Sequence, residues 1–385
     1  MSHARPSHVF ALLLLATSGS VARSHAQAPE WRVSAAPLLT LEDNGTPATE
    51  FHRIVGAWRL PNGNVVVANG STAELRVFDS RGGLAEIFGR RGRGPGEFES
   101  MSVIDVSADT AVIYDRSTRR ATTVQFGSKP RLLATVTMMA AGTSSGFDIT
   151  GRLSDGRWVA TMGMGTPGGW DAPKGVHRTK GTVALVPRDG TGSVEPVAEV
   201  QSMASITYMP GTDKSKWATG PAAFTPWYYD QVSGGALWFG ESGSDSLVRL
   251  DAQGHRRQIL LPLPSIALSP RLVSAAKEPE LQAALQRGSG EYTNFKYSVE
   301  NLPPRLPYFA GMLAGANGEL WVQEYSSEPS AAARYLVLDA QGRPLGRVAT
   351  PAGFRATHAG RDFVVGITRD TDGVEGVRVL RLERR

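Results

Sequence analysis

Oxygen-bearing side chains recur at one position of a short phrase that this chain repeats six times. Each copy has a turn of small or polar residues and then a run of strand-forming residues, at 60–69, 107–115, 153–162, 232–241, 315–324 and 358–367. The residue six positions after the turn is, in order, Asn69, Asp115, Met162, Glu241, Glu324 and Ile367. Because hard cations such as Ca²⁺ take oxygen ligands, the four polar members, Asn69, Asp115, Glu241 and Glu324, are candidate metal ligands. The alternative is that each caps the turn after its own strand by bonding backbone amides.

A second candidate site is the glycine-rich loop at 89–98, which contains three arginines. Consecutive backbone amides and guanidinium groups can bind an anion together, so Arg90 and Arg93 are candidate ligand-binding residues. The alternative is that the glycines shape a connection between strands and leave the arginines in solvent.

Aromatic residues gather in the segments that lie between copies of the phrase. They are Trp170, Trp217, Trp227, Tyr228, Tyr229, Tyr292 and Tyr325, with His177 nearby. Trp and Tyr are favoured at binding interfaces, so Trp170, Trp217, Trp227, Tyr228, Tyr292 and His177 are candidate ligand-binding residues. Trp227 and Tyr229 are also compatible with an alternating strand whose side chains belong to the core.

The elements that position these residues are hairpins. A turn followed by a β-branched and aromatic run is a hairpin signal, and each phrase continues into a second hairpin. The turn Asp-Ala-Gln-Gly recurs at 251–254 and 339–342, where Asp opens the turn and Gly supplies a positive φ. The repeating unit is therefore four antiparallel strands, A to D, and the sequence predicts an all-β, six-bladed β-propeller.

The last repeat contains only three strands, at 354–358, 363–367 and 377–382. A strand-like segment at 31–41 precedes the first repeat. We expect this segment to join the C-terminal blade and to close the ring with a strand from each end of the chain, which would leave few exposed edges.

The loop at 89–98 also carries a family resemblance. Its spacing, G-x-x-G-x-G-P-G-x-F after Phe88, resembles the hinge between blades in NHL-repeat-like six-bladed propellers. The motif is intact only once, so the chain resembles a divergent, secreted bacterial branch of that family. The resemblance implies that the glycines of the loop form a hinge. Similar lactonase-like propellers place a metal near the axis among residues like those of the polar column.

Insertions between repeats all fall in the connections of one face, those between strands B and C and between strands D and A. They are 162–181, 201–226 and 262–306. Apolar spacing predicts a helical stretch at 269–287, which Pro279 is expected to divide into two short helices. Functional loops tend to lie on one side of a rigid scaffold, so this face is the expected binding face.

Residues 1–26 have the pattern of a secretory signal peptide, with Arg5 before an apolar core and a small-x-small site ending at Ala26. The expected organisation is this peptide followed by one propeller domain at 27–385. Export to the periplasm or beyond is therefore expected, and no later segment is apolar enough to span a membrane. The chain has no cysteine, which excludes disulfides and thiol chemistry.

The formal net charge of +5 is spread along the chain, whereas nucleic-acid binding needs a concentrated basic patch. The leading hypothesis is therefore a secreted propeller that binds a protein, peptide or carbohydrate through its loop-rich face. One alternative is a metal-assisted hydrolase or lyase, lactonase-like, with its site in the central funnel of the same face. Another is a structural component of an envelope assembly. No cofactor other than Ca²⁺ is implied, and the sequence leaves the oligomeric state open.

Overall fold

The computed structural model describes residues 28–140, 147–165, 172–213, 217–328 and 331–384. The expected signal peptide at 1–26 lies outside these residues, as does Trp170. None of the helices in the described part of the chain is long and apolar enough to cross a bilayer.

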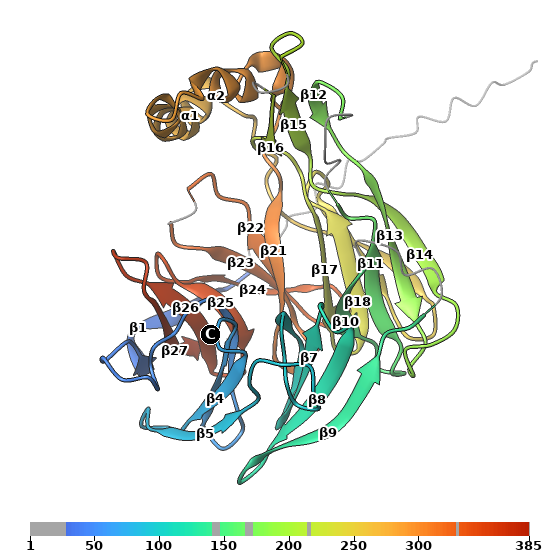
Figure 1. The fold of residues 1–385 in the computed structure, drawn as a ribbon, viewed down its shortest axis with the longest axis vertical. Helices are drawn as coiled ribbons and strands as arrows, with labels where there is room; N and C mark the ends of the chain where they lie inside the picture. The colour runs from blue at the N-terminus through green and yellow to red at the C-terminus, as the bar shows by residue number, and fades with distance from the viewer. Residues whose placement is uncertain (1–27, 141–146, 166–171, 214–216, 329–330, 385) are drawn as a thin grey trace, which may run out of the picture.

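Four antiparallel sheets of four strands each follow one another along the chain (Figure 1). The first contains β2(Ile54–Arg59), β3(Val65–Asn69), β4(Glu74–Phe78) and β5(Leu84–Phe88). The second contains β6(Met101–Ser107), β7(Thr110–Asp115), β8(Arg120–Phe126) and β9(Pro130–Thr137). The third contains β10(Asp148–Arg152), β11(Trp158–Met162), β13(Lys180–Val186) and β14(Glu195–Gln201). The fourth contains β17(Tyr228–Ser233), β18(Ala236–Glu241), β19(Ser246–Leu250) and β20(Arg256–Leu260).

The remaining long strands form one eight-stranded sheet, in the order β21-β22-β23-β24-β1-β27-β26-β25. They are β21(Phe309–Ala314), β22(Leu320–Glu324), β23(Arg334–Leu338), β24(Pro344–Ala349), β25(Arg355–Ala359), β26(Phe363–Arg369), β27(Glu375–Glu383) and β1(Glu30–Leu41). β1 is antiparallel to β27 over most of its length, from Arg32 to Leu41. It touches β24 only through Glu30 and Trp31, in parallel register.

The repeated phrase supplies a largely buried strand to each repeat. All five residues of β3 are buried, and the first four of them are apolar, as expected of a strand covered on both faces. The turns behave as the sequence predicts: Asp339 Oδ1 accepts backbone hydrogen bonds from Gln341 and Arg343, at 2.9 and 2.8 Å, and Gly342 has a φ of 83°.

The first strands of the repeats contact one another in a circle. β2 contacts β6, β6 contacts β10, β10 contacts β17, β17 contacts β21, β21 contacts β25, and β25 contacts β2. This arrangement of antiparallel sheets around shared inner strands is a propeller-type fold.

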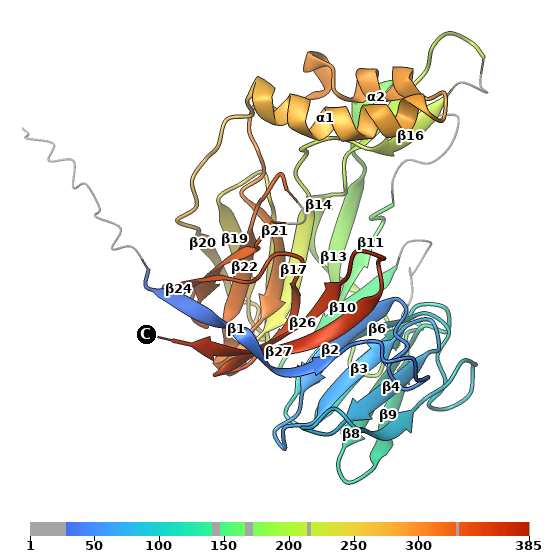
Figure 2. The ribbon, with the colours of Figure 1, turned by 90° about the vertical axis from the view of Figure 1, so that its left-hand side faces the viewer.

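The three insertions assemble into a small unit, here called the cap, at one end of the molecule (Figure 2). It contains the three-stranded sheet β12(Gly175–His177), β15(Ser205–Tyr208) and β16(Ala218–Pro221), with α1(Pro270–Leu285), α2(Gly290–Lys296) and the short turn η2(Val299–Asn301). Tyr292 and Phe295 of α2 pack against Ile206 of the sheet. The sequence placed these segments on one face but did not predict that they form a sheet of their own.

The expected division of the helix at Pro279 is wrong. α1 runs unbroken from 270 to 285, with Pro279 inside it and the Ser269 hydroxyl accepting a hydrogen bond from the Leu272 amide at its start. Because proline has no N–H, the carbonyl of Ala275 loses its usual helical donor. Ala275 and Pro279 are both exposed, so this carbonyl does not lie in a packed core.

Trp31 fixes β1 to the rest of the sheet and generates a test. Its ring is 7% exposed, and the Arg384 guanidinium lies 4.4 Å from the ring centroid. Trp31→Ala should lower the free energy of unfolding by about 3–5 kcal/mol, because it removes a buried aromatic ring. Leu38→Ala, in the same strand but 45% exposed, should change it by less than about 0.5 kcal/mol. Urea denaturation measures both, and equal effects would contradict the role given to Trp31.

Candidate functional site

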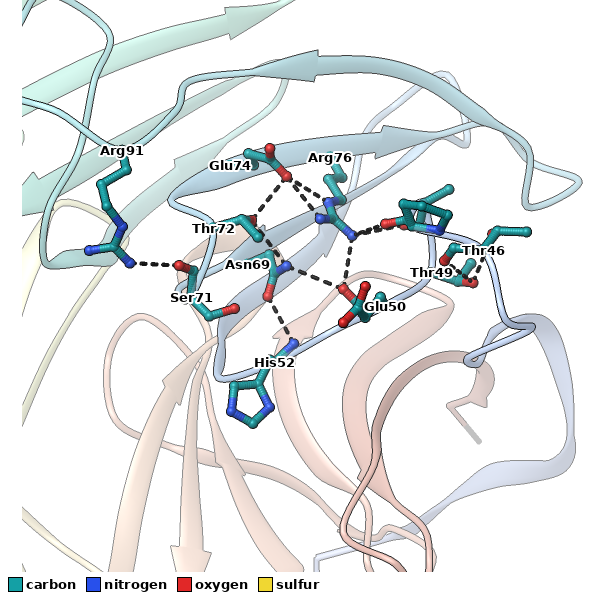
Figure 3. Close-up of polar contacts among 12 residues, drawn as sticks. Thr46, Thr49, Glu50, His52, Asn69, Ser71, Thr72, Glu74, Arg76 and Arg91 are labelled. Carbon is teal, nitrogen blue, oxygen red and sulfur yellow. Dashed lines mark hydrogen bonds and ion pairs between the residues drawn. The ribbon is translucent and has the colours of Figure 1, made fainter.

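Asn69, the first polar residue of the repeated column, joins the end of β3 to the segment that enters β2 (Figure 3). Its Oδ1 accepts a hydrogen bond from the His52 amide at 3.0 Å, and its Nδ2 donates to Thr72 Oγ1 at 3.1 Å. The amide group is fully buried. Both ends of this side chain are therefore engaged within its own sheet.

Arg76, which the sequence analysis did not single out, organises the same segment. Although it lies in the apolar strand β4, its Nη1 donates to the carbonyls of Pro47, Ala48 and Glu50 at 2.8, 3.1 and 2.9 Å (Figure 3). Its Nε donates to Glu74 at 2.9 Å. An arginine inside a buried strand was the available signal, because a buried charge needs partners.

Asp115 has both carboxylate oxygens occupied. Oδ2 accepts from the backbone amides of Glu99 and Ser100, at 2.5 and 3.4 Å, and Oδ1 accepts from Ser117 and Thr118, at 2.9 and 3.0 Å. This is the turn-capping role described as the alternative to metal binding.

Glu241 and Glu324 pair with arginines. Glu241 accepts from the Gln201 amide at 2.9 Å and from Arg178 at 3.3 Å, whereas Glu324 is paired with Arg347. No contact joins any two of the four polar column residues, and the described residues contain no group of three or more His, Cys, Asp or Glu that could hold a metal. The structure thus leaves the cation site as a prediction and shows a structural role for each member.

In the glycine-rich loop at 89–98, Arg90 and a backbone amide bind the carboxylate of Glu97, a residue of the same loop. Glu97 Oε2 accepts from the Gly94 amide at 2.7 Å, and Glu97 Oε1 accepts from Arg90 Nε at 2.8 Å. The Gly94 amide, and after it Arg90, lowers the pKa of Glu97. The Arg93 carbonyl accepts from Arg120 at 2.6 Å. The place that an anion would take between Arg90 and the loop amides is therefore filled by Glu97.

Among the described residues, the predicted aromatic candidates do not line one common site. Trp227 is 42% exposed and stacks on Tyr229, with ring centroids 6.5 Å apart. Burial raises the pKa of the Tyr228 hydroxyl well above its usual value. Tyr292 belongs to the interior of the cap, and Trp217 Nε1 donates to the Gly211 carbonyl at 3.4 Å. His177 lies in β12, with Nδ1 3.2 Å from the Gly175 carbonyl.

A cleft between the cap and the sheets brings together aromatic residues from three segments. This cleft, here called the cap cleft, has a volume of about 510 Å³ and is lined by Ala223, Phe224, Ala275, Ala276, Pro279, Tyr297, Tyr325, Ser327 and Glu328. Only Tyr325 was recognised in the sequence. Phe224 and Tyr297 were missed because their approach depends on how two insertions fold against each other.

A second cavity, of about 520 Å³, lies between the first strands of five repeats. Its polar lining residues include Asp105, Gln231, Arg355, Thr357 and His358. The tight turns at 107–108 and 314–317 also line it, so this central cavity reaches the end of the sheets opposite the inserted connections.

His358 is held neutral in the central cavity. Its Nδ1 accepts a hydrogen bond from the Arg59 amide at 3.2 Å, which leaves the proton of the neutral ring on Nε2. Burial lowers the pKa of His358 to about 4. The contact joins the last repeat to the first.

Asp230, in β17, links the first strands of the third and fourth sheets. It accepts a short hydrogen bond from the Thr150 hydroxyl of β10. Burial raises the pKa of Asp230 to about 6, with a smaller contribution from the Asp148 carboxylate. The inner strands thus carry polar groups whose charge states are set by burial.

Comparisons with known proteins support the fold alone. A member of the DUF4221 family from Bacteroides vulgatus is 12% identical, with a TM-score of 0.50 over 92% of this chain and 99% of that one. A Bacteroides fragilis protein that is thought to be exported is 10% identical, with a TM-score of 0.45 over 92% and 99%. A virginiamycin B lyase from Staphylococcus aureus is 10% identical, with a TM-score of 0.36 over 86% and 94%. No protein-family model matches the chain. No curated protein matches it.

The metal hypothesis can be tested by thermal unfolding. Because the polar atoms of Asn69 and Asp115 already have hydrogen-bond partners and both glutamates have arginine partners, added Ca²⁺ or Zn²⁺ should shift the midpoint by less than about 1 °C, as should EDTA. A metal-dependent rise that is lost in Glu241→Gln, and kept in the exposed control Glu300→Gln, would instead support a cation in the column.

The lowered pKa of His358 predicts a pH dependence of stability. Between a folded pKa of about 4 and an unfolded pKa of about 6.5, the unfolded chain binds more protons at this residue. The free energy of unfolding should therefore fall as the pH is lowered through this window, by on the order of 1 kcal/mol per pH unit from this group. In His358→Gln this contribution to the pH dependence should vanish. The free energies of unfolding of the unmodified protein and the variant, measured with urea, should therefore converge toward pH 4. Parallel curves would contradict the assignment.

Proposed function

We propose that this chain is an exported six-bladed propeller of a divergent NHL-repeat-like type, and that it binds a protein, peptide or carbohydrate partner on the face that bears the cap. The cap cleft, built where separate insertions meet over one face, is the observation that carries the binding proposal.

The six-blade count is supported by the circle of inner-strand contacts from β2 to β25 and back. In this reading the eight-stranded sheet is two blades, one of β21 to β24 and one of β25, β26, β27 and β1. The parallel contact of β1 with β24 covers only two residue pairs, which is why the sheet divides there.

The NHL-like assignment is supported by the geometry of the loop at 89–98. Phe98 is fully buried, and Arg91 and Phe98 form an isolated bridge across the loop. A Cβ on Gly89 would approach the Phe98 ring to 2.8 Å, and Gly89 has a φ of 86°. A glycine is therefore required at the start of this hinge.

Binding at the cap face is supported by exposed apolar residues around the cap. Val299 is 87% exposed, Leu285 is 56% exposed and Ile266 is 46% exposed. All three lie in the insertion at 262–306, which supplies α1, α2 and η2 to the cap. The cap cleft has a volume of about 510 Å³, within the range of ligand sites.

A second candidate function is a hydrolase or lyase acting in the central cavity. It is favoured by one observation, the grouping of His358, Arg355 and Asp105 around that cavity. The neutral His358 imidazole, with Nδ1 bonded to the Arg59 amide, has its Nε2 proton as the available donor. A substrate in this site would need to reach the end opposite the cap.

The binding proposal can be tested with a photo-reactive amino acid in the full chain, expressed in its native host. The probe at Val299, on the cap, should give a cross-linked product. The same probe at Arg81, an exposed residue in the tight turn between β4 and β5, should give none. Products at Arg81 alone would contradict binding at the cap face, and products at both positions would favour a structural component embedded in an assembly.

A further inference from the structure

We propose that the cap cleft receives a positively charged side chain, lysine or arginine, of a peptide or protein partner. This inference rests on the proposed binding function and narrows the partner class. It depends on the aromatic walls of the cleft, on the charge of its lining and on a helix carbonyl that Pro279 deprives of its usual donor.

The walls are aromatic rings presented by different segments. Phe224, in the connection after β16, and Tyr297, after α2, meet edge to face, with centroids 6.2 Å apart and ring planes at 75°. Tyr325, in the loop after β22, also lines the cleft. The face of an aromatic ring carries negative charge density, which attracts ammonium and guanidinium groups.

Phe224 is held in a conformation that its residue type disfavours. Its φ is 55°, in the left-handed region, which a bulky side chain rarely adopts. Such strain persists only where the surrounding structure enforces it, and it gathers at functional sites. The strained backbone here places an aromatic ring at the cleft wall.

The charge of the cleft is complementary to a cation. Among the described residues that line it, Glu328 is the only charged one, and it is exposed at the rim. Lys296 of the cap lies 5.4 Å from the Tyr297 ring centroid, and both Glu280 oxygens neutralise it at 3.0 Å. That contact shows the Tyr297 ring already accepting a cation from outside the cleft.

A backbone acceptor completes the site. Ala275 lines the cleft, and the residue four positions later is Pro279. Proline has no N–H, so the Ala275 carbonyl lacks its helical donor. An N–H of a lysine or arginine can supply it. A neutral sugar could also donate to this carbonyl and to the Glu328 carboxylate, but it would lack the attraction between opposite charges that a cation gains there.

The test compares two blocked tripeptides, acetyl-Gly-Lys-Gly-amide and acetyl-Gly-norleucine-Gly-amide, which differ in the charge of one side chain of similar length. Binding to the full chain is measured by NMR titration, with maltohexaose as a carbohydrate probe. We expect the lysine peptide to bind about 10-fold more tightly than the norleucine peptide, which corresponds to about 1.4 kcal/mol.

Two variants assign the preference to the cleft. Glu328→Gln and Tyr325→Leu should each reduce it to less than about threefold, with the midpoint of thermal unfolding monitored to confirm folding. Matched controls are Glu300→Gln, an exposed glutamate of η2, and Tyr208→Leu, a cap tyrosine remote from the lining. Both should retain the full preference.

The outcomes separate this inference from the proposed function. Two outcomes would overturn the cationic ligand and leave the cap face as a binding site: equal binding of both peptides, and binding of maltohexaose alone. In either case the binding must be lost in Tyr325→Leu. Binding of no probe would overturn the cationic ligand, and the cross-linking at Val299 would then decide the proposed function separately. A lysine preference that survives both cleft variants would place the site elsewhere and also overturn the inference.

Discussion

The antiparallel pairing of β1 with β27 is the constraint on which the rest of the structure depends. It gives the last repeat its fourth strand and leaves β24 and β27 covered rather than as open edges, which would otherwise template association with other chains. The chain has no cysteine, so no disulfide can share this role. The pairing is secured at its ends by side chains: Trp31 is buried under Arg384 at one end, and Arg378 pairs with Glu42 at the other, at 2.5 Å.

Polar contacts then fix how neighbouring sheets meet around the axis. The contacts His358–Arg59 and Thr150–Asp230 connect inner strands of adjacent repeats, and Ser233 of β17 donates to the Glu319 carbonyl in the turn between β21 and β22. Such contacts specify register in a way that apolar packing does not, because a buried polar group that loses its partner carries a penalty of about 1–3 kcal/mol. The packed sheets that result can carry three long insertions at one end without distorting their core.

The architecture was predictable because its signal is repeated and local. The residue types at turns such as Asp339 to Gly342 indicate the turn itself, and an apolar run such as that of β3 indicates a buried strand. The site was much less predictable. Asn69 and Asp115 share a position in the phrase, but their bonds to nearby amides depend on how each preceding connection folds. Phe224 and Tyr297 become neighbours only when two insertions pack together. The pairing of β12 with β15, which builds the sheet of the cap, joins segments that β13 and β14 separate along the chain. The predicted break of α1 at Pro279 was wrong because a proline on an exposed helix face is tolerated when the carbonyl that it leaves without a donor, here that of Ala275, is not buried.

The sequence separation of β1 and β27 makes completion of their sheet depend on a late step of synthesis. Leu41 of β1 pairs with Val377 of β27, 336 positions further along the chain. β1 therefore stays without this partner until the chain has been synthesised as far as β27. A product shortened before β27 would keep an unpaired edge and an exposed Trp31, the features that chaperones and proteases act on. Long-range pairing of this kind also slows folding, which is the kinetic cost of joining two strands so far apart in the sequence.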